Sequence, residues 1–203
     1  MSQDCVQSHC YSVRFGSPTT ATGVLMNTHR NFLTPGGTPS PTTPWFFTSE
    51  MWLAQPSQAN YWVEMGIVEG WHMNLNTTVY ADFAWWRNTA GADSGWMYLR
   101  YNIPDGTTHY YQVSRGPAWG TWLIMLDSNV VLTTGNTGFW TGQPQVGGEC
   151  YCSSTNEHAD TFDMYTKYVD SSGTVRNYSA AGYSVHAGMN GVDHGTYWSW
   201  NAP

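Results

Sequence analysis

The stretch Tyr61-Trp62-Val63-Glu64-Met65-Gly66-Ile67-Val68-Glu69-Gly70-Trp71 combines β-branched and aromatic residues with two carboxylates. A polar turn over residues 55–60 precedes it, and the run is too short for a typical helix. These features predict a central β-strand. Because successive side chains of a strand point to opposite faces, Glu64 shares a face with Trp62.

Two interpretations of Glu64 remain open. Its carboxylate lies at the rim of a solvated sheet face or is held by an arginine, as acidic residues usually do. Alternatively it lies in an aromatic-lined cleft, where it is suited to acid–base chemistry or to binding a sugar hydroxyl.

Short strand-like segments continue on both sides of this stretch, separated by Gly, Pro, Asn and Ser. No amphipathic helix of convincing length occurs. The expected strands cover residues 11–15, 21–27, 45–53, 79–87, 96–103, 109–114, 121–126, 130–132, 143–152, 162–169, 174–178, 183–186 and 196–200. This spacing predicts an all-β fold, an antiparallel two-sheet sandwich of the jelly-roll (concanavalin-like) type.

Three local signals refine this expectation. Pro104-Asp105-Gly106 predicts a hairpin turn between residues 96–103 and 109–114, and Asp127-Ser128-Asn129 predicts a second hairpin. Gly147-Gly148, inside a strand, indicates a bulge or a close approach of two backbones.

Chain length and charge limit the number of domains and the classes of partner. The 203 residues predict a single domain, 1–203, with an N-terminal arm (1–16) and a Pro/Gly-rich loop (34–44). With 7 Lys+Arg against 14 Asp+Glu, the chain has no basic patch for phosphates, so nucleic-acid binding is not expected. No apolar run is long enough to predict a membrane span.

The composition is typical of secreted proteins. Lys167 is the single lysine, and Thr, Ser, Gly, Asn and Trp are abundant. We therefore expect an extracellular protein whose export signal is absent from this sequence, and the alternative is a cytosolic chain.

The four cysteines, Cys5, Cys10, Cys150 and Cys152, are disulfide candidates that allow three pairings. These are Cys5 with Cys10 and Cys150 with Cys152, or either crossed arrangement. A bridge across Cys150-x-Cys152 would be strained, which favours crossed bridges. No histidine stands at a zinc-like spacing from these thiols, so no metal and no cofactor is predicted.

Aromatic residues exceed what a core of this size needs, with 12 Trp and 13 Tyr. We expect some of them to line an exposed groove or an interface. One hypothesis is a lectin-like module in which Trp62, Tyr80, Trp85 and Trp86 stack on a glycan. Another is a homo-oligomer or a subunit of an extracellular fibre, with the surplus aromatics at its interfaces.

Residues 44–155 resemble a known family in the order of their motifs: Trp52, Trp62-Val63-Glu64-Met65-Gly66, Tyr80-Ala81-Asp82-Phe83, Gly120-Thr121-Trp122, and Gln145-Val146-Gly147-Gly148-Glu149. The order is similar to that of the secreted glutamic peptidase-like β-sandwiches. This group includes neprosin-type plant enzymes, fungal eqolisins and uncharacterised bacterial relatives.

The resemblance implies a peptidase that uses two acids. Neprosin-type sequences carry one catalytic Glu before a Gly and a second after a Gly-Gly pair, which correspond here to Glu64 and Glu149. Eqolisins have Gln in place of the first acid, so Glu64 departs from that branch. The implied groove for a peptide ligand would include Trp62, Tyr80 and Gln145.

Overall fold

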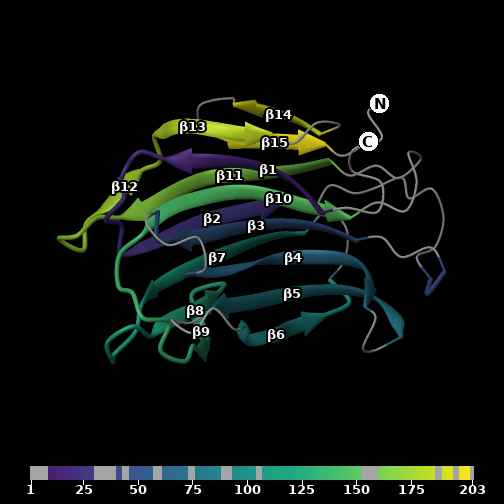
Figure 1. Ribbon diagram of the computed structural model, residues 1–203, viewed down its shortest axis with the longest axis horizontal. Coiled ribbons are helices and arrows are strands. Elements are labelled where there is room, and N and C mark those ends of the chain that lie inside the picture. Colours follow the sequence, from purple (N-terminus) through teal and green to yellow (C-terminus); the bar gives the residue numbers. More distant parts are fainter. Residues whose placement is uncertain are drawn as a thin grey trace.

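The computed structural model describes residues 9–29, 40–42, 46–56, 61–72, 76–87, 93–103, 107–151, 160–185, 189–193 and 197–201. Its strands form two sheets that lie one over the other (Figure 1). Every strand pairing is antiparallel. The predicted all-β sandwich of jelly-roll type is confirmed.

The two sheets interleave segments that are distant in the sequence. The seven-stranded sheet runs, in spatial order, β13 (Ala180–Val185), β1 (His9–Gly16), β10 (Gln143–Tyr151), β3 (Phe46–Ala54), β4 (Trp62–His72), β5 (Thr77–Arg87) and β6 (Asp93–Tyr101). The eight-stranded sheet runs β14 (Asn190–Asp193), β15 (Tyr197–Asn201), β11 (Asp160–Val169), β2 (Gly23–His29), β7 (Thr108–Arg115), β8 (Trp122–Leu126) and β9 (Asn129–Thr133), while β12 (Val175–Asn177) pairs with β11.

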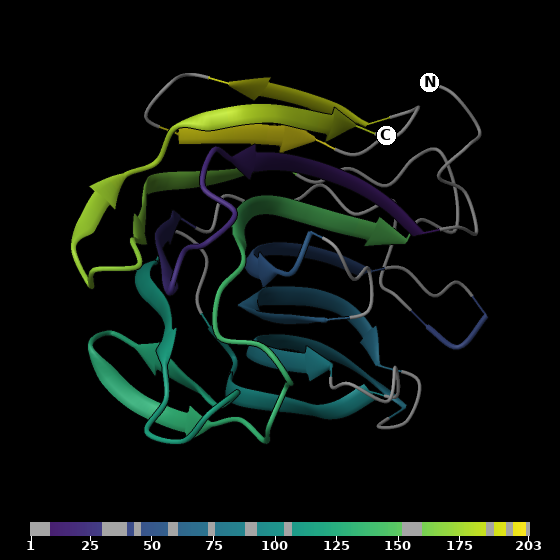
Figure 2. The ribbon, with the colours of Figure 1, turned by 60° about the vertical axis from the view of Figure 1, so that its left-hand side comes forward.

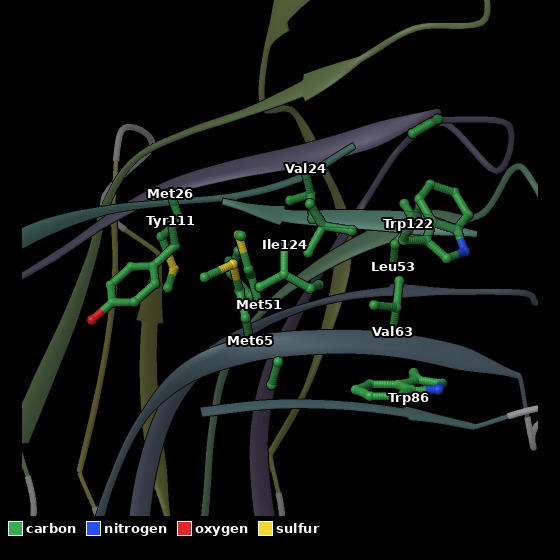
Figure 3. Close-up of a cluster of buried hydrophobic side chains, with 14 of the residues drawn as sticks. Val24, Met26, Met51, Leu53, Val63, Met65, Trp86, Tyr111, Trp122 and Ile124 are labelled. Atoms are coloured by element: carbon green, nitrogen blue, oxygen red, sulfur yellow. The ribbon is translucent and has the colours of Figure 1, made fainter. Parts of the chain in front are cut away.

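The core lies between the sheets and follows from strand alternation. Met51, Leu53, Val63 and Met65 of the seven-stranded sheet meet side chains of β2, β7 and β8 (Figure 3). All four are fully buried. The alternate residues of β3 and β4 therefore point to the outer face of the seven-stranded sheet, away from the other layer.

One of the two predicted hairpins is wrong. β6 pairs with β5, whereas β7 pairs with β2 and β8, so the chain crosses between sheets where Pro104-Asp105-Gly106 predicted a tight turn. Residues 104–106 themselves lie outside the described part of the chain. The reason for the crossing is packing, because Tyr111 and Val113 of β7 are buried in the core between the layers.

The second hairpin is confirmed. Leu126 pairs with Asn129, which leaves a two-residue loop of Asp127 and Ser128, with φ of 50° and 69°. Two positive φ values are the geometry that matches the twist of the flanking strands. In Figure 2 this connection joins β8 and β9 at the edge of the molecule, away from β13 to β15.

The expected close approach at Gly147-Gly148 is confirmed. Gly147 has φ of 152°, and a Cβ at this position would overlap the carbonyl of Ser12 on β1. Only glycine fits there, so β10 lies tightly between β1 and β3.

Both ends of the described chain are held in sheets. Residues 9–16 of the expected N-terminal arm form β1, between β10 and β13, and Cys10 lies directly opposite Cys150. Cys5 and Cys152 fall outside the described residues, as does most of the 34–44 loop, so the cysteine connectivity stays a prediction. At the other end, β15 pairs with β11 and β14, and Trp198 is buried. Nothing in the described chain is a helix long and apolar enough to cross a bilayer.

Candidate active-site groove

The outer face of the seven-stranded sheet carries two cavities that join into one groove. The first measures about 320 Å³ and the second about 590 Å³, and both are lined by Tyr11, Glu64, Trp85 and Glu149. The first is further lined by Phe46, Thr48, Glu50, Val68, Gly70, Trp71, Val79, Phe83, Trp96 and Tyr98. The second is further lined by Trp52, Ala54, Gln55, Pro56, Trp62, Arg87, Gln143 and Gln145.

Strand register explains why these residues meet. Trp52 of β3 is flanked by Gln145 of β10 and Glu64 of β4, and Glu64 lies opposite Trp85 of β5. Directly cross-strand residues point to the same face of a sheet. The groove therefore runs along the strands, from the row of Phe46 to the row of Ala54.

Three carboxylates occupy the middle of the groove. Glu50 is 1% exposed and Glu64 5% exposed, while Glu149 is half-buried. Thr48 links two of them, because its Oγ1 donates a hydrogen bond of 2.7 Å to Oε1 of Glu50 and accepts one of 2.8 Å from the backbone N–H of Glu149. This arrangement fixes β10 and β3 relative to each other beside the acids.

Tyr11 is the cross-strand neighbour of Glu149. Burial raises the pKa of its phenol far above the usual range, and so do the charge of Glu149, a hydrogen bond to that side chain, and the charges of Glu50 and Glu64. Tyr11 therefore keeps its proton over the working range of any enzyme and serves Glu149 as a neutral donor.

Glycines make room for Glu50. It lies between Gly147 of β10 and Gly66 of β4 in the strand register. A Cβ on Gly66 would come within 2.6 Å of both the Cα and the Cβ of Glu50. The Glu-Met-Gly sequence of β4 thus supplies both a carboxylate and the space that the backbone and Cβ of Glu50 occupy.

Aromatic rings form one wall of the groove. Trp62 and Trp85 meet edge to face with centroids 5.5 Å apart, and Trp85 meets Trp96 in the same way at 5.5 Å. Phe83 stacks on Trp96 at 4.8 Å. Such contacts hold the rings rigidly, so this wall presents a fixed apolar surface beside the acids.

Five of the residues predicted from the sequence line the groove, namely Glu64, Glu149, Trp62, Trp85 and Gln145. Trp86 does not, because it packs in the core at 8% exposure and points between the sheets (Figure 3). Tyr80 lines neither cavity and shares the strand face of Trp86. Placing Tyr80, Trp85 and Trp86 in one groove was wrong, since neighbouring strand residues point to opposite faces.

Sequence analysis missed Glu50, Tyr11 and Arg87. A signal for Glu50 existed, because it stands two residues before Trp52 on a predicted strand and therefore shares its face. For Tyr11 there was none, since its contact with Glu149 depends on β1 pairing with β10 across 138 residues of sequence. Across the described residues, no group of three His, Cys, Asp or Glu side chains is placed to hold a metal ion.

No family model matches the chain, and no curated protein matches it by sequence. Solved structures match its fold over nearly its whole length. Scytalido-glutamic peptidase with a transition-state analog inhibitor has a TM-score of 0.62 at 11% identity, and the same peptidase with a peptide-based analog has 0.56 at 9%. SCP-B, a member of the eqolisin family of peptidases solved with the tripeptide Ala-Ile-His, has 0.52 at 10%.

Each of these comparisons covers 96% of this chain and 97% of the other. At such identities the likeness concerns the course of the backbone and not the residues of the site. The chain has a glutamic peptidase-like fold.

Proposed function

We propose that the chain is an acid-active endopeptidase in which Glu64 and Glu149 are the catalytic pair. One observation carries this proposal: the two carboxylates point to the same face and line the same two cavities, although β3 separates their strands. The shared fold with glutamic peptidases supports it.

The chemistry requires one carboxylate and one carboxylic acid. The ionised member takes a proton from the water that attacks the scissile carbonyl, and the protonated member donates to the oxygen on which negative charge develops. Either residue suits either role.

Uncharged hydrogen-bond donors contact two of the groove acids, which is compatible with one acid being ionised and another protonated. Tyr11 donates to Glu149, and Thr48 donates to Glu50. Hydrogen bonds from uncharged groups hold a carboxylate in place without the strong preference for ionisation that a guanidinium contact imposes. Glu50 is in this scheme a third acid of the groove, and Thr48 holds its side chain.

The groove has the length and the lining that an extended peptide requires. It follows β3 from Phe46 to Ala54, which corresponds to roughly 26 Å at about 3.3 Å per residue. The acids lie near its middle, so a bound chain would extend on both sides of the scissile bond. This position suits an endopeptidase.

The test is digestion of an unfolded protein and of a peptide library between pH 3 and pH 7, with cleavage sites read by mass spectrometry. We expect Glu64→Gln and Glu149→Gln each to reduce the cleavage rate by about 100-fold or more. Glu69→Gln is the matched control, because Glu69 is also buried on β4 but alternates to the opposite face. Unchanged cleavage by both groove variants, in equally purified protein, would falsify the proposal.

A glycan ligand is a second candidate, favoured by the wall of Trp62, Trp85 and Trp96. Aromatic faces stack on sugar rings, and carboxylates bind their hydroxyls. Titration calorimetry with soluble β-linked and α-linked oligosaccharides tests it. Binding that is retained in Glu149→Gln but lost in Trp62→Ala supports a lectin-like module. If no sugar gives a measurable heat of binding, the glycan hypothesis is wrong.

An extracellular location and assembly into an oligomer or fibre are further proposals that rest on composition. Trp119 and Tyr183 are large aromatic side chains outside the groove, and they are 55% and 66% exposed. Such side chains could lie at an interface between subunits. Light scattering at high protein concentration tests the assembly, and a strict monomer rules it out.

A further inference from the structure

The hydrogen-bonded ladder between β3 and β10 is interrupted beside the groove acids. The register of the two strands skips residues 148–149 of β10 and 48–49 of β3, although pairs form on both sides of this position. Both strands are described throughout their length. With β1, on its other side, β10 keeps a continuous register over the same residues. The interruption therefore lies on the β3 side alone, at the position of Glu149.

The side chain of Thr48 fills this interruption. The N–H of Glu149 donates to Thr48 Oγ1 at 2.8 Å, whereas a regular antiparallel pair would direct it to a main-chain carbonyl of the facing strand. The same hydroxyl donates to Oε1 of Glu50 at 2.7 Å and lies 3.4 Å from the carbonyl oxygen of Glu149. Because a hydroxyl has a single proton, the shorter contact, to Glu50, is the one that receives it. One side chain thus holds the backbone of one acid and the carboxyl of another.

The strands do not need this side chain to stay together, because main-chain pairs flank the interruption on both sides. What the arrangement adds is a link between Glu149 and Glu50. Thr48 is only 5% exposed, so water does not compete for the two bonds. Local disruptions of a ladder re-aim side chains and are frequent next to active sites. The placement of Glu149 in the groove therefore depends on the Thr48 hydroxyl.

We propose that Thr48 is a positioning residue of the groove, whose hydroxyl sets the placement of Glu149 and of the Glu50 carboxyl relative to each other. Its consequence for catalysis rests on the proposed peptidase function. A catalytic group that is misplaced by about 1 Å can lose about 100-fold in rate. The titratable groups that line the same cavity are Tyr11, Glu50, Glu64, Tyr98 and Glu149.

Three variants separate the hydroxyl from the rest of the side chain. Thr48→Val keeps the shape and removes the hydroxyl, Thr48→Ser keeps the hydroxyl, and Thr48→Ala replaces Thr48→Val if that variant does not fold. Thr134→Val is the matched control, because Thr134 is also buried but lines neither cavity. Its hydroxyl likewise accepts from a backbone N–H, that of Trp122 at 2.9 Å, and donates to the carbonyl of Gly135 at 2.8 Å.

Steady-state kinetics on a cleaved peptide give the first measurement. We expect kcat to fall about 10- to 100-fold in Thr48→Val, with KM changed by less than about 3-fold and with an altered pH–rate profile between pH 3 and pH 7. Thr48→Ser should regain most of the rate and the original profile. Thr134→Val should keep both, even if it loses stability.

Amide hydrogen exchange, followed by NMR, gives a second measurement that needs no cleavage. We expect the amide of Glu149 to exchange about 10-fold or more faster in Thr48→Val than in the unaltered chain, and to regain its protection in Thr48→Ser. The amides of Val146 and Cys150, which lie in register with β1, are the internal references.

The two measurements distinguish this inference from the peptidase proposal. Equal protection of the Glu149 amide with and without the hydroxyl overturns the positioning role, whatever the cleavage assay shows. Lost protection with the kinetics of Thr134→Val also overturns it, because the bond would then be structural alone. If the unaltered chain cleaves no peptide, the peptidase proposal is wrong, and faster exchange in Thr48→Val that Thr48→Ser reverses still supports the placement of Glu149 by Thr48.

Discussion

The seven-stranded sheet carries buried acids on both faces, and their surroundings differ. Asp82, fully buried between the sheets, accepts hydrogen bonds from Tyr111 Oη at 2.5 Å and from Arg100 Nε at 2.7 Å. On the other face, Glu50 accepts a hydrogen bond from Thr48 and Glu149 accepts one from Tyr11, both uncharged donors. Burial raises the pKa of the Asp82 carboxyl and outweighs Tyr111 and Arg100, which both favour its ionised form.

The network around Asp82 ties the two layers together. Asp82 is on β5 of one sheet and Tyr111 on β7 of the other. Arg100 Nη1 also lies 3.5 Å from Asp127 Oδ2, an atom that His109 Nδ1 approaches to 3.0 Å. Both sets include buried acids, but they differ in place: Asp82 ties the two layers together, whereas the groove acids line the cavities on the outer face.

The largest expected effect is on stability and comes from Asp82→Ala. Removing the carboxylate leaves the buried Tyr111 hydroxyl without its acceptor and takes one ionic partner from Arg100, which is 37% exposed and keeps Asp127, so we expect a cost of about 2–4 kcal/mol. For a chain of this size the melting temperature should fall by about 2–4 °C per kcal/mol. Differential scanning calorimetry of Asp82→Ala and of Glu64→Gln measures the loss of stability. If both variants lost the same stability, acids on the two faces of the sheet would not differ in their structural role.

A smaller loss is expected from Gly66→Ala. The new Cβ overlaps the Ser49 carbonyl and the backbone of Glu50, so β3 and β4 must separate, at a cost of about 1–3 kcal/mol. Because Glu50 moves with β3, cleavage should fall together with stability. Gly182→Ala is the control, since nothing lies within 4 Å of a Cβ there. If Gly66→Ala kept the stability of the unaltered chain, β3 and β4 would accommodate a methyl group that their packing indicates they cannot.

Tyr11→Phe removes the donor to Glu149 and leaves the ring in place. We expect the cleavage rate to fall by about 10-fold, equivalent to about 1.4 kcal/mol in the barrier, with a changed pH–rate profile and little change in unfolding free energy. Steady-state kinetics across pH 3–7 measure it. A large loss of stability with an unaltered pH profile would instead place Tyr11 with the structural residues.

The smallest expected effect is the pH dependence of stability that Asp82 contributes. Burial, the largest influence, raises the pKa of Asp82 above 3.8, although Tyr111 and Arg100 lower it. Between 3.8 and that raised pKa the folded chain binds more protons than the unfolded chain, so this contribution to stability is present at low pH and is lost as pH rises.

Urea unfolding of the unaltered chain and of Asp82→Asn from pH 3 to pH 7 tests this sign. The advantage of the unaltered chain should shrink as pH rises. An advantage that grows instead would show that Arg100 outweighs burial at this site.

Local signals predicted the elements because they depend on neighbours in the sequence. Strand alternation placed Trp62 and Glu64 on one face, and Asp127-Ser128 closed its hairpin with positive φ values. The same rule, applied to Trp85 and Trp86, shows that only one of the two could line a groove. Which of them does so depends on the side of the sheet that the second layer covers.

The sequence by itself determined an all-β sandwich, a central strand that carries Glu64, and a glycine pair before Glu149 that admits a neighbouring backbone. The tertiary structure alone decided that β7 leaves its expected hairpin partner, and that Tyr11, Glu50, Glu64 and Glu149 meet on one face. The reason is physical. Side-chain direction repeats every two residues and is readable locally, but the order β1-β10-β3-β4 arises from pairings between distant segments, which form only when both sheets bury their apolar faces together.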